Sequence, residues 1–502
     1  MTRSSQMHLR NQTSTPRMNA THNEGTLPAV NHQTVEEICG LIAAKRQQFC
    51  TLSDGIWDTP ELNYEEHRSA AQHEAILKAE GFRLTKGIAN MPTALLGEFG
   101  EGLPIVAILG EYDALPGLSQ QANVAEPKPL ENGGNGHGCG HNLLGTAALQ
   151  AATAVKDYLQ KHSLAGTVRF YGCPAEEGGS SKGFMVKEGV FDDVDIAICW
   201  HPATFTGVNS PVSLACNELN FYFKGRAAHA ASSPHLGRSA LDAVELMNVG
   251  VNYMREHMPS SARVHYAITD SGGHAPNVVQ ANATVRYLVR ARQLPELHQL
   301  VKRVKKIAEG AALMTETEVS SEVISGDANL LANPPLEARM HEHLLALGPI
   351  AFDDEDRKMA AMFQTALSAE DIAESYARFG VKPQPDLTLH DGIYPLYSPN
   401  EAFIGSTDVG TVSWVVPTVQ IRSATYAIGT PAHSWQLVAQ GKTGAAHKGM
   451  EYAAKAMASL AIDLLATPEL IAQAKADHQE RLQHTPFENP IPDDVFAPIP
   501  QG

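Results

Sequence analysis

The sequence has few cysteines and fewer basic than acidic residues. These two features limit the cellular location and the binding partners that the protein can have. Six cysteines are spread over 502 residues without the spacing of a disulfide framework, which predicts a reducing, cytoplasmic location. Lysine and arginine number 38 against 55 acidic residues, a formal net charge of −17. Nucleic acids and anionic membranes need a basic face, so we expect neither as a partner. An anionic substrate stays open, because a few local arginines suffice to bind it.

Long apolar runs and N-terminal acidic residues are also missing. No apolar run approaches the roughly 20 residues of a membrane-spanning helix. The first 23 residues contain no Asp or Glu, which fits an organelle-targeting peptide, but the lack of an amphipathic pattern favours a disordered tail over residues 1–33. A second tail is expected over 471–502, where the last 20 residues hold five prolines.

Short apolar runs alternate with a helical stretch in the first half of the chain. We expect strands at 103–109, 167–171 and 194–199, and a helix at 143–159 between the first two. This order predicts an α/β fold with a largely parallel sheet flanked by helices. Polar residues follow each strand, and the carboxyl ends of parallel strands are where ligands bind.

An α+β pattern interrupts this arrangement. Strand-like runs at 219–224, 262–269 and 283–290 alternate with helical runs at 239–257 and 295–313. The organisation predicted is a catalytic domain in two parts, 34–215 and 326–470, with a lid and dimerisation domain inserted at 216–325. Residues 349–399 mix charges with scattered prolines and show no clear pattern.

Cys139 and His141 are the first candidate metal ligands. They lie two residues apart in a glycine-rich segment, so both side chains can point to one side. Thiolate and imidazole are ligands for Zn²⁺ and related metals, although a C-x-H pair alone lacks the spacing of recognised zinc sites.

Two adjacent carboxylates, Glu176 and Glu177, strengthen the metal interpretation. A solvated surface pair is the plain alternative, but the two residues follow a strand and precede two glycines in a tight loop. One could bind metal while the other takes a proton from water. His201 and His433, each of which alone is more often a surface residue, complete a set of one thiolate, three imidazoles and one carboxylate. That set is enough for a two-metal centre.

Seven segments of the chain resemble signatures of the metallo-aminoacylase and carboxypeptidase clan, which includes indole-acetyl-amino-acid and hippurate hydrolases. They occur in the family's order and span residues 34–470; they are GEYDALP (110–116), GHGCGHN (136–142), TVRFYGCPAEEGG (167–179), CWHP (199–202), GRAAHAASSP (225–234), GGHAPNVV (272–279) and GTPAHSW (429–435). Within the clan, the segments 117–135, 406–414 and 434–450 are most similar to the B-type subunit of aminobenzoyl-glutamate hydrolases.

The resemblance implies a set of residue roles. The metal ligands would be Cys139, His141, Glu177, His201 and His433. They would hold two divalent metal ions per subunit, Zn²⁺ or Mn²⁺, with Co²⁺ as a further candidate.

The remaining roles concern catalysis and the substrate. Glu176 would be the general base, and Asp113 would support a metal-binding histidine. His229 would reach across a dimer to stabilise the oxyanion. Asn277 and Arg290 would hold the carbonyl and carboxylate of the substrate. Three positions depart from the usual pattern and leave substrate preference open: Glu111, Asn142 and Ser239.

The function expected is a metal-dependent amidohydrolase acting on an N-acyl or N-aroyl amino acid similar to aminobenzoyl-glutamate. The subunit would pair with itself or with a paralogous subunit. Two alternatives are a dipeptidase or exopeptidase of the same clan, and a non-catalytic partner subunit. The presence of Glu176 beside a ligand speaks against the latter.

Overall fold

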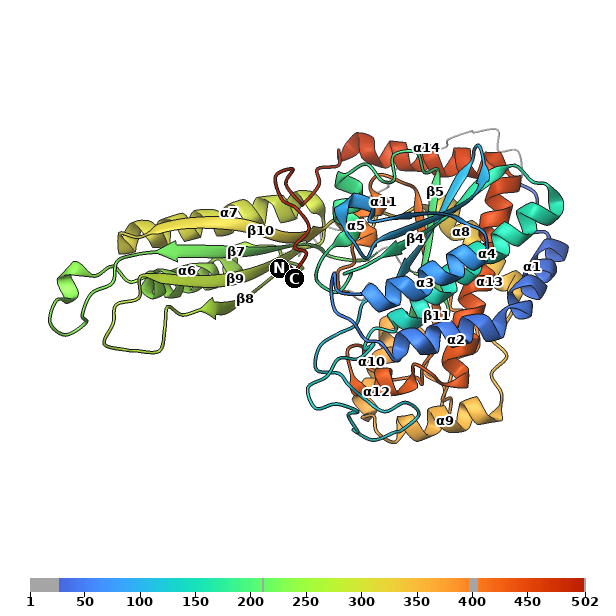
Figure 1. The fold of residues 1–502 in the computed structure, drawn as a ribbon, viewed down its shortest axis with the longest axis horizontal. Coiled ribbons are helices and arrows are strands. Elements are labelled where there is room, and N and C mark those ends of the chain that lie inside the picture. Colours follow the sequence, from blue (N-terminus) through green and yellow to red (C-terminus); the bar gives the residue numbers. More distant parts are fainter. Residues whose placement is uncertain (1–26, 210–211, 397–404, 501–502) are drawn as a thin grey trace, which may run out of the picture.

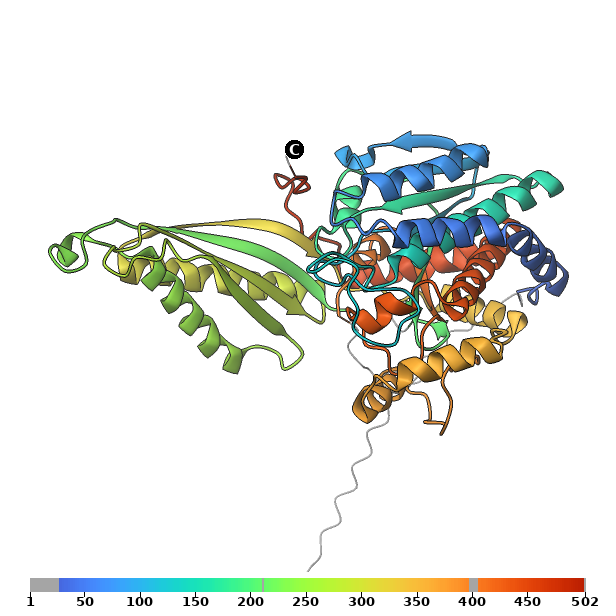
Figure 2. The ribbon, with the colours of Figure 1, turned by 60° about the horizontal axis from the view of Figure 1, so that its bottom comes forward.

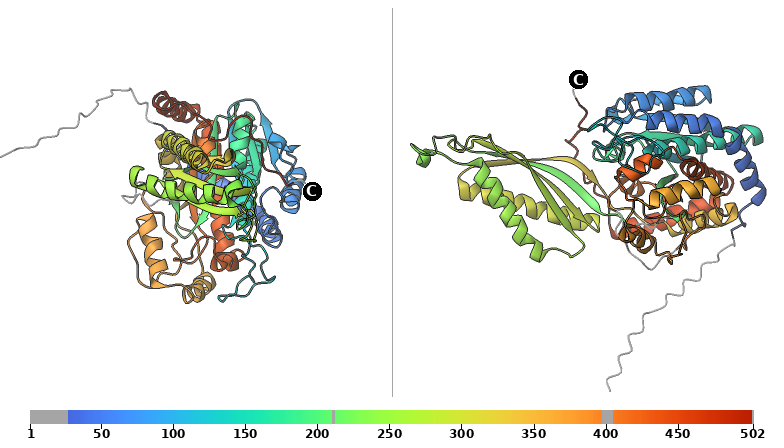
Figure 3. Two further views of the ribbon diagram at one scale, coloured as in Figure 1. Left: turned by 90° about the vertical axis from the view of Figure 1, so that its left-hand side faces the viewer. Right: turned by 90° about the horizontal axis from the view of Figure 1, so that it is seen from below.

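Two separate β-sheets organise the chain, which is described here by a computed structural model covering residues 27–209, 212–396 and 405–500. Figure 1 shows one sheet buried within a large helical lobe and the other in a slender lobe that projects from it. Figures 2 and 3 show the same separation from other directions.

The large lobe contains a seven-stranded sheet in the order β1-β2-β4-β3-β5-β11-β6. Its four central neighbours, β4, β3, β5 and β11, run parallel, while β1, β2 and β6 are antiparallel additions at the two edges. This arrangement confirms the predicted fold class. The strands are β1 (Arg83–Lys86), β2 (Leu95–Glu101), β3 (Ile105–Glu111), β4 (Gly166–Cys173), β5 (Ile196–Ala203), β6 (Gly207–Val208) and β11 (Thr418–Ala424).

Both faces of this sheet are covered by helices. Val106 and Ile108 of β3 pack into one core, whereas Ala107 and Leu109 pack into another on the opposite face, as the two-residue period of a strand requires. The first core takes in helices α1 (His32–Ala44), α2 (Arg46–Trp57), α3 (His67–Ala79), α4 (His141–His162), α8 (Pro334–Leu347) and α13 (Gly444–Ala466). The second takes in α5 (Ser181–Lys187) and α11 (Val409–Ser413).

The projecting lobe has an antiparallel four-stranded sheet in the order β10-β7-β9-β8. Alternate residues of β9 are buried against two long helices that cover one face, which gives this lobe a core of its own. The elements are β7 (Ala215–Lys224), α6 (Ala240–Met254), β8 (Arg263–Asp270), β9 (Asn282–Ala291), α7 (Leu294–Thr315) and β10 (Glu318–Asp327). Short 3₁₀ turns occupy Ile88–Asn90, Pro234–Leu236 and Arg255–His257.

Several elements differ from the sequence expectation. The tail expected over 471–502 is wrong in its first part, because α14 (Pro468–His484) continues there and buries Leu470, Ala474 and His478 at a four-residue spacing. The tail expected over 1–33 is too long at its end, since α1 begins at His32; residues 1–26 lie outside the described residues. The described part of the chain begins with two helices, α1 and α2, separated at Lys45.

The segment without a clear pattern contains two helices, α9 (Asp354–Gln364) and α10 (Ala369–Phe379). Each begins with a capping box, in which side chain and backbone bond reciprocally. A further short helix, α12 (Trp435–Gln440), precedes α13. Among the described residues, no helix is both long and apolar enough to span a membrane.

Candidate metal centre

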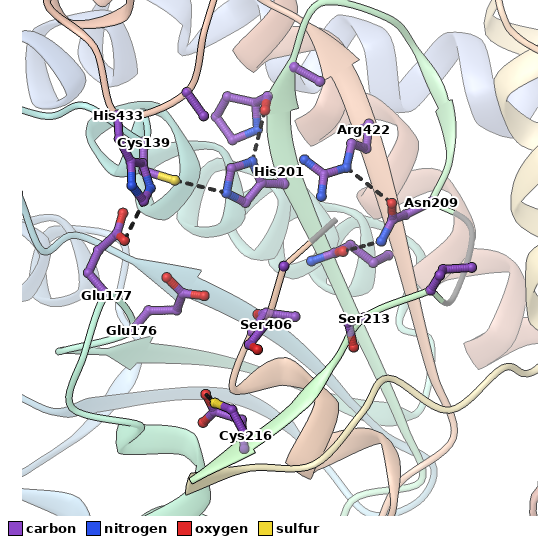
Figure 4. Close-up of a pocket in the computed structure, with 18 of the residues that line it drawn as sticks. Cys139, Glu176, Glu177, His201, Asn209, Ser213, Cys216, Ser406, Arg422 and His433 are labelled. Carbon is purple, nitrogen blue, oxygen red and sulfur yellow. Dashed lines mark hydrogen bonds and ion pairs between the residues drawn. The ribbon is translucent and has the colours of Figure 1, made fainter. Parts of the chain in front are cut away.

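A cavity of about 470 Å³ lies at the carboxyl ends of the parallel strands, where the two lobes meet. Residues after β4, β5 and β11 line it from the large lobe, and residues of β7, β9 and β10 line it from the projecting lobe. Figure 4 shows Cys139, Glu177 and His433 close together on one side of this cavity, with His201 next to Cys139 and nearer the middle.

The segment before α4 places Cys139 and His141. Gly140 has a left-handed φ of 78°, and a Cβ atom there would lie 1.9 Å from the hydroxyl of Tyr426. Only glycine fits this turn, which turns the thiol and the imidazole towards the cavity. The Cys139 Sγ lies 3.4 Å from His201 Nε2.

Asp113 orients the buried His141. Its Oδ1 is 2.8 Å from His141 Nδ1, and its Oδ2 accepts a hydrogen bond of 2.9 Å from the backbone of Glu177. The carboxylate therefore fixes the ring so that Nε2 faces the other candidate ligands, as expected for a residue that supports a metal-binding histidine.

The loop that carries the two glutamates is held in place by Glu66. Ala175 adopts a positive φ of 53°, and its N–H donates to Glu66 Oε1 at 2.9 Å. Burial, and then the nearby Asp113, raises the pKa of Glu66 to about 8. An alanine at a positive φ is strained, so its surroundings must hold it in this conformation. The buried side chains of Glu66 and Asp113 do so through their hydrogen bonds to the backbone of Ala175 and Glu177. They thereby keep Glu176 and Glu177 at the cavity edge.

The two remaining histidines reach the site from different elements. His201 lies near the carboxyl end of β5, and its Nδ1 is 2.8 Å from the carbonyl oxygen of Pro202. A nitrogen that close to a carbonyl must donate, so Nε2 keeps its lone pair towards Cys139. His433 has a positive φ of 55° in the loop before α12, and its Nε2 is 3.3 Å from Glu177 Oε2.

These residues form two groups that share one thiol. The ligand atoms of Cys139, His141 and His201 lie within 4.8 Å of one another, and those of Cys139, Glu177 and His433 do the same. His141 Nε2 and Glu177 Oε1 are buried without a hydrogen-bond partner, although only 3.9 Å separates them. A cation between them would satisfy both atoms. Sulfur, imidazole and carboxylate donors fit Zn²⁺ and other borderline metals.

A buried charge cluster adjoins these groups. Glu111 Oε2 lies 3.3 Å from His141 Nε2, and Glu111, His141 and Glu176 form a third group of possible ligands. Lys182 Nζ is 2.7 Å from Glu111 Oε1 and 2.7 Å from Asp408 Oδ1, and all three side chains are buried. Sequence reasoning noted Glu111 only as a departure and gave no role to Lys182 or Asp408. Lys182 stands in no recognised motif, and Asp408 lies in the segment 406–414, for which the resemblance implied no residue role.

The other two departures have structural partners. The side-chain amide of Asn142 donates to Ser53 Oγ and to the carbonyl of Gly441, both at 3.1 Å, which ties α4 to α2. Ser239 caps α6 by accepting a hydrogen bond from the backbone of Asp242. Neither side chain belongs to the cavity lining.

The residues expected to contact substrate fall in two places. Arg290 lines the cavity and donates to Ser406 Oγ at 2.7 Å. His229 and Asn277 lie next to each other on exposed loops of the projecting lobe, where the backbone of Ala230 donates to Asn277 at 2.9 Å. Neither residue lines the cavity, so one subunit does not bring them to the candidate ligands.

Comparison with known proteins shows which family this chain is similar to. The profile of "Peptidase family M20/M25/M40" matches residues 107–373, more than half of the chain. The B-type subunit of the p-aminobenzoyl-glutamate hydrolase of Escherichia coli is 47% identical, with 90% of this chain and 96% of that protein covered. The chain belongs to peptidase family M20/M25/M40.

More distant similarities extend the comparison. The Xaa-Arg dipeptidase of Mus musculus is 28% identical over 86% of this chain and 89% of its own length. The crystal structure of an aminobenzoyl-glutamate utilization protein from Klebsiella pneumoniae superposes with a TM-score of 0.52 at 17% identity, covering 86% of this chain and 97% of that one. Membership of family M20/M25/M40 confirms the prediction of a metallo-hydrolase that cleaves amide bonds, and the groups described above are its candidate metal ligands.

Proposed function

We propose that the protein hydrolyses the amide bond of an N-acyl or N-aroyl amino acid of the aminobenzoyl-glutamate kind. The observation that carries the proposal is the 47% identity, over nearly the full length of both chains, with the B-type subunit of the E. coli p-aminobenzoyl-glutamate hydrolase. Four of the five candidate ligands line one cavity together with Glu176, and the fifth, His141, is buried within reach of Cys139 and His201, which supports an active subunit.

In this proposal the site holds two divalent ions, Zn²⁺ or Mn²⁺, with Co²⁺ as a further candidate. The ligands are Cys139, His141, Glu177, His201 and His433. When bound, such ions supply Lewis acidity towards the amide carbonyl and towards water.

The remaining steps belong to side chains. Glu176 accepts a proton from the attacking water and delivers it to the leaving nitrogen. Burial, together with the charges of Glu111 and Glu177, raises the pKa of Glu176, which favours proton uptake in the absence of cations. Asp113 keeps His141 oriented, and Arg290 binds a carboxylate of the substrate.

A second polypeptide completes the site in this proposal. His229 and Asn277 are exposed, and they lie away from the cavity of their own chain. From a partner they could reach the substrate, with His229 donating to the oxyanion and Asn277 to the carbonyl. The partner is a second copy or a paralogue. The E. coli relative is one of two differently named subunits of a hydrolase, which supports the paralogue.

One experiment separates this proposal from its alternatives. The purified chain, alone and with a paralogous subunit where one exists, is assayed on aminobenzoyl-glutamate, benzoyl-glycine, acetyl amino acids and dipeptides, with metal content measured in the same samples. We expect release of aminobenzoate that chelation abolishes and that Zn²⁺, Mn²⁺ or Co²⁺ restores. Glu176→Gln serves as the matched inactive control. Cleavage of dipeptides alone, or full activity in verified metal-free protein, would contradict the proposal.

A further inference from the structure

The walls of the cavity carry opposite charges. Glu176 and Glu177 lie with the candidate ligands on one side. Figure 4 shows Arg422 and Asn209 on the other side, with His201 between the two sides. Arg378 of α10 also lines the cavity. The acidic wall suits cations, so a separate occupant must account for the arginines.

Arg422 is held rigidly beside the candidate metal centre. It lies in β11 directly opposite His201 in the strand register, and its side chain is 9% exposed. Its Nε donates to Asn209 Oδ1 at 3.1 Å, and Asn209 in turn donates to Gln420 Oε1 at 2.6 Å. This chain of bonds fixes the guanidinium plane, while no hydrogen bond among the described residues uses its two Nη atoms.

Arg378 also lacks an ion-pair partner among the described residues. Its Nε is buried without a hydrogen-bond acceptor, and within the described parts of the chain no carboxylate lies within ion-pair distance of Arg378 or Arg422. Other poorly exposed arginines here do have such partners, since Arg339 pairs with Asp463 at 2.5 Å and Arg169 with Asp193 at 2.6 Å. An unpaired cation inside a protein is costly, so the absence of a counter-ion at two positions in one cavity is significant.

The two arginines also repel each other. Burial, and then the charge of Arg378, lowers the pKa of Arg422 to about 10. An anion bound between them would remove this repulsion and use the free donors. A carboxylate fits best, because its two oxygens match the parallel N–H groups of a guanidinium.

We propose that Arg378 and Arg422 bind a second carboxylate of the substrate, the side-chain carboxylate of the amino acid that is released. Together with Arg290, which takes the first carboxylate, they make the cavity selective for N-acyl derivatives of dicarboxylic amino acids. This inference rests on the proposed function and adds the residues that select the amino acid. A monocarboxylic substrate would leave the arginine pair uncompensated.

The competing explanation is electrostatic support of the neighbouring thiol. The charge of Cys139, when ionised, acts on both arginines, so they could stabilise the thiolate without touching substrate. In that case their replacement would affect every substrate equally. The two explanations therefore differ in the ratio of rates on charged and uncharged substrates.

The test compares aminobenzoyl-glutamate with aminobenzoyl-glutamine, which has the same shape without the second charge. In the wild-type protein we expect kcat/KM to favour the glutamate substrate by about 10- to 100-fold, the usual worth of a hydrogen-bonded charge. Arg378→Gln and Arg422→Gln should bring this ratio close to one. Arg357→Gln is the matched control, because Arg357 lies outside the cavity lining and has its own partner, Asp391 at 2.7 Å; its ratio should equal that of the wild type.

Three results would overturn the inference. One is an unchanged ratio in both cavity variants, and another is an equal loss on both substrates. The third is that the cavity variants discriminate less than the wild type against the α-amide of aminobenzoyl-glutamate, which lacks the α-carboxylate, but discriminate as the wild type does against aminobenzoyl-glutamine, which lacks the side-chain carboxylate. If a glutamine variant does not fold, Arg378→Lys or Arg422→Lys, which keeps the charge, is used in its place. We expect the lysine variants to lower the ratio of kcat/KM values less than the glutamine variants do.

Failure of the proposed function would look different, because the wild-type protein would then hydrolyse neither aroyl substrate. The arginine pair is still testable by calorimetry with glutarate and its monoacid analogue, butyrate. The inference would be supported if the wild type binds glutarate more tightly than butyrate and Arg422→Gln removes this difference. Equal binding of both acids by the wild type would overturn it.

Discussion

Lys182→Met should destabilise the large lobe strongly, because within the described chain Lys182 is the only lysine or arginine at ion-pair distance from the buried Glu111 and Asp408. Its Nζ lies 2.7 Å from Glu111 and 2.7 Å from Asp408, and none of these side chains is more than 4% exposed. Methionine keeps the length of the side chain and removes the charge. Breaking a buried ion pair by removing one partner costs about 3–5 kcal/mol, and here one lysine serves two partners.

The destabilisation should also depend on pH. Burial raises the pKa of Asp408 to about 6 even with Lys182 beside it. Without the lysine this pKa must rise further, so the folded variant binds a proton more tightly than the unfolded chain. When the pKa of a carboxyl group is higher in the folded than in the unfolded state, the free energy of unfolding falls as pH increases. The loss of stability in Lys182→Met should therefore be smaller at pH 5.5 than at pH 8.

The measurement is urea unfolding of chelator-treated protein, followed by the fluorescence of its four tryptophans, of which Trp57, Trp200 and Trp414 are buried. Lys358→Met is the matched control, because Lys358 is exposed and its pair with Glu355 should be worth less than about 1 kcal/mol. Adding Asp408→Asn to Lys182→Met should recover part of the loss. A Lys182→Met protein within about 1 kcal/mol of wild type at both pH values would refute the coupling described here.

Other outcomes follow from the same geometry. Glu176→Gln should retain metal while kcat falls by about 10²–10⁴-fold, whereas Glu177→Gln should lose metal as well; the reverse pattern in metal analysis would exchange their roles. His229→Ala should lose about 10²–10³-fold in kcat and regain part of it when co-expressed with Glu176→Gln, and mixed dimers without any gain would exclude action across an interface. Burial lowers the pKa of His447, but its hydrogen bond to Asp54 outweighs this effect and raises the pKa to about 9 from 6.5. The contribution of this pair to the free energy of unfolding is complete below pH 6.5 and is lost as pH rises towards 9. Asp54→Asn should therefore reduce the change in the free energy of unfolding between pH 6.5 and pH 9. The same pH dependence in the variant and the wild type would contradict the pairing.

The sequence predicted the parallel sheet because short apolar runs alternate with a helical stretch, and one of these runs forms β3, which is buried throughout. It failed for α14 because that helix is mostly polar. Its buried residues are Leu470, Ile471, Ala474 and His478. One of these four is a histidine, and the proline-rich end that follows the helix suggested a tail.

The candidate ligands could be proposed from the sequence because they stand in short motifs, with Cys139 just before α4 and Glu177 just after β4. The residues that hold them were not predictable. Glu66 lies 109 positions from the Ala175 amide that it binds, and no local pattern connects the two. Arg378 belongs to the segment where the sequence showed no clear pattern, and Arg422 lies inside a buried strand where a hydrophobic residue would be expected.

The overall charge of the chain and the charge of its cavity act over different distances. A net charge of −17 repels an anionic substrate only weakly at physiological salt, because exposed charges more than about 8 Å away are screened. Inside the cavity, which Arg290, Arg378 and Arg422 line, the screening is far weaker. The acidic residues on the opposite wall, Glu176 and Glu177, face the candidate metal groups instead. An acidic protein can therefore select a dianionic substrate, provided that its cavity keeps the cation-binding and anion-binding walls apart.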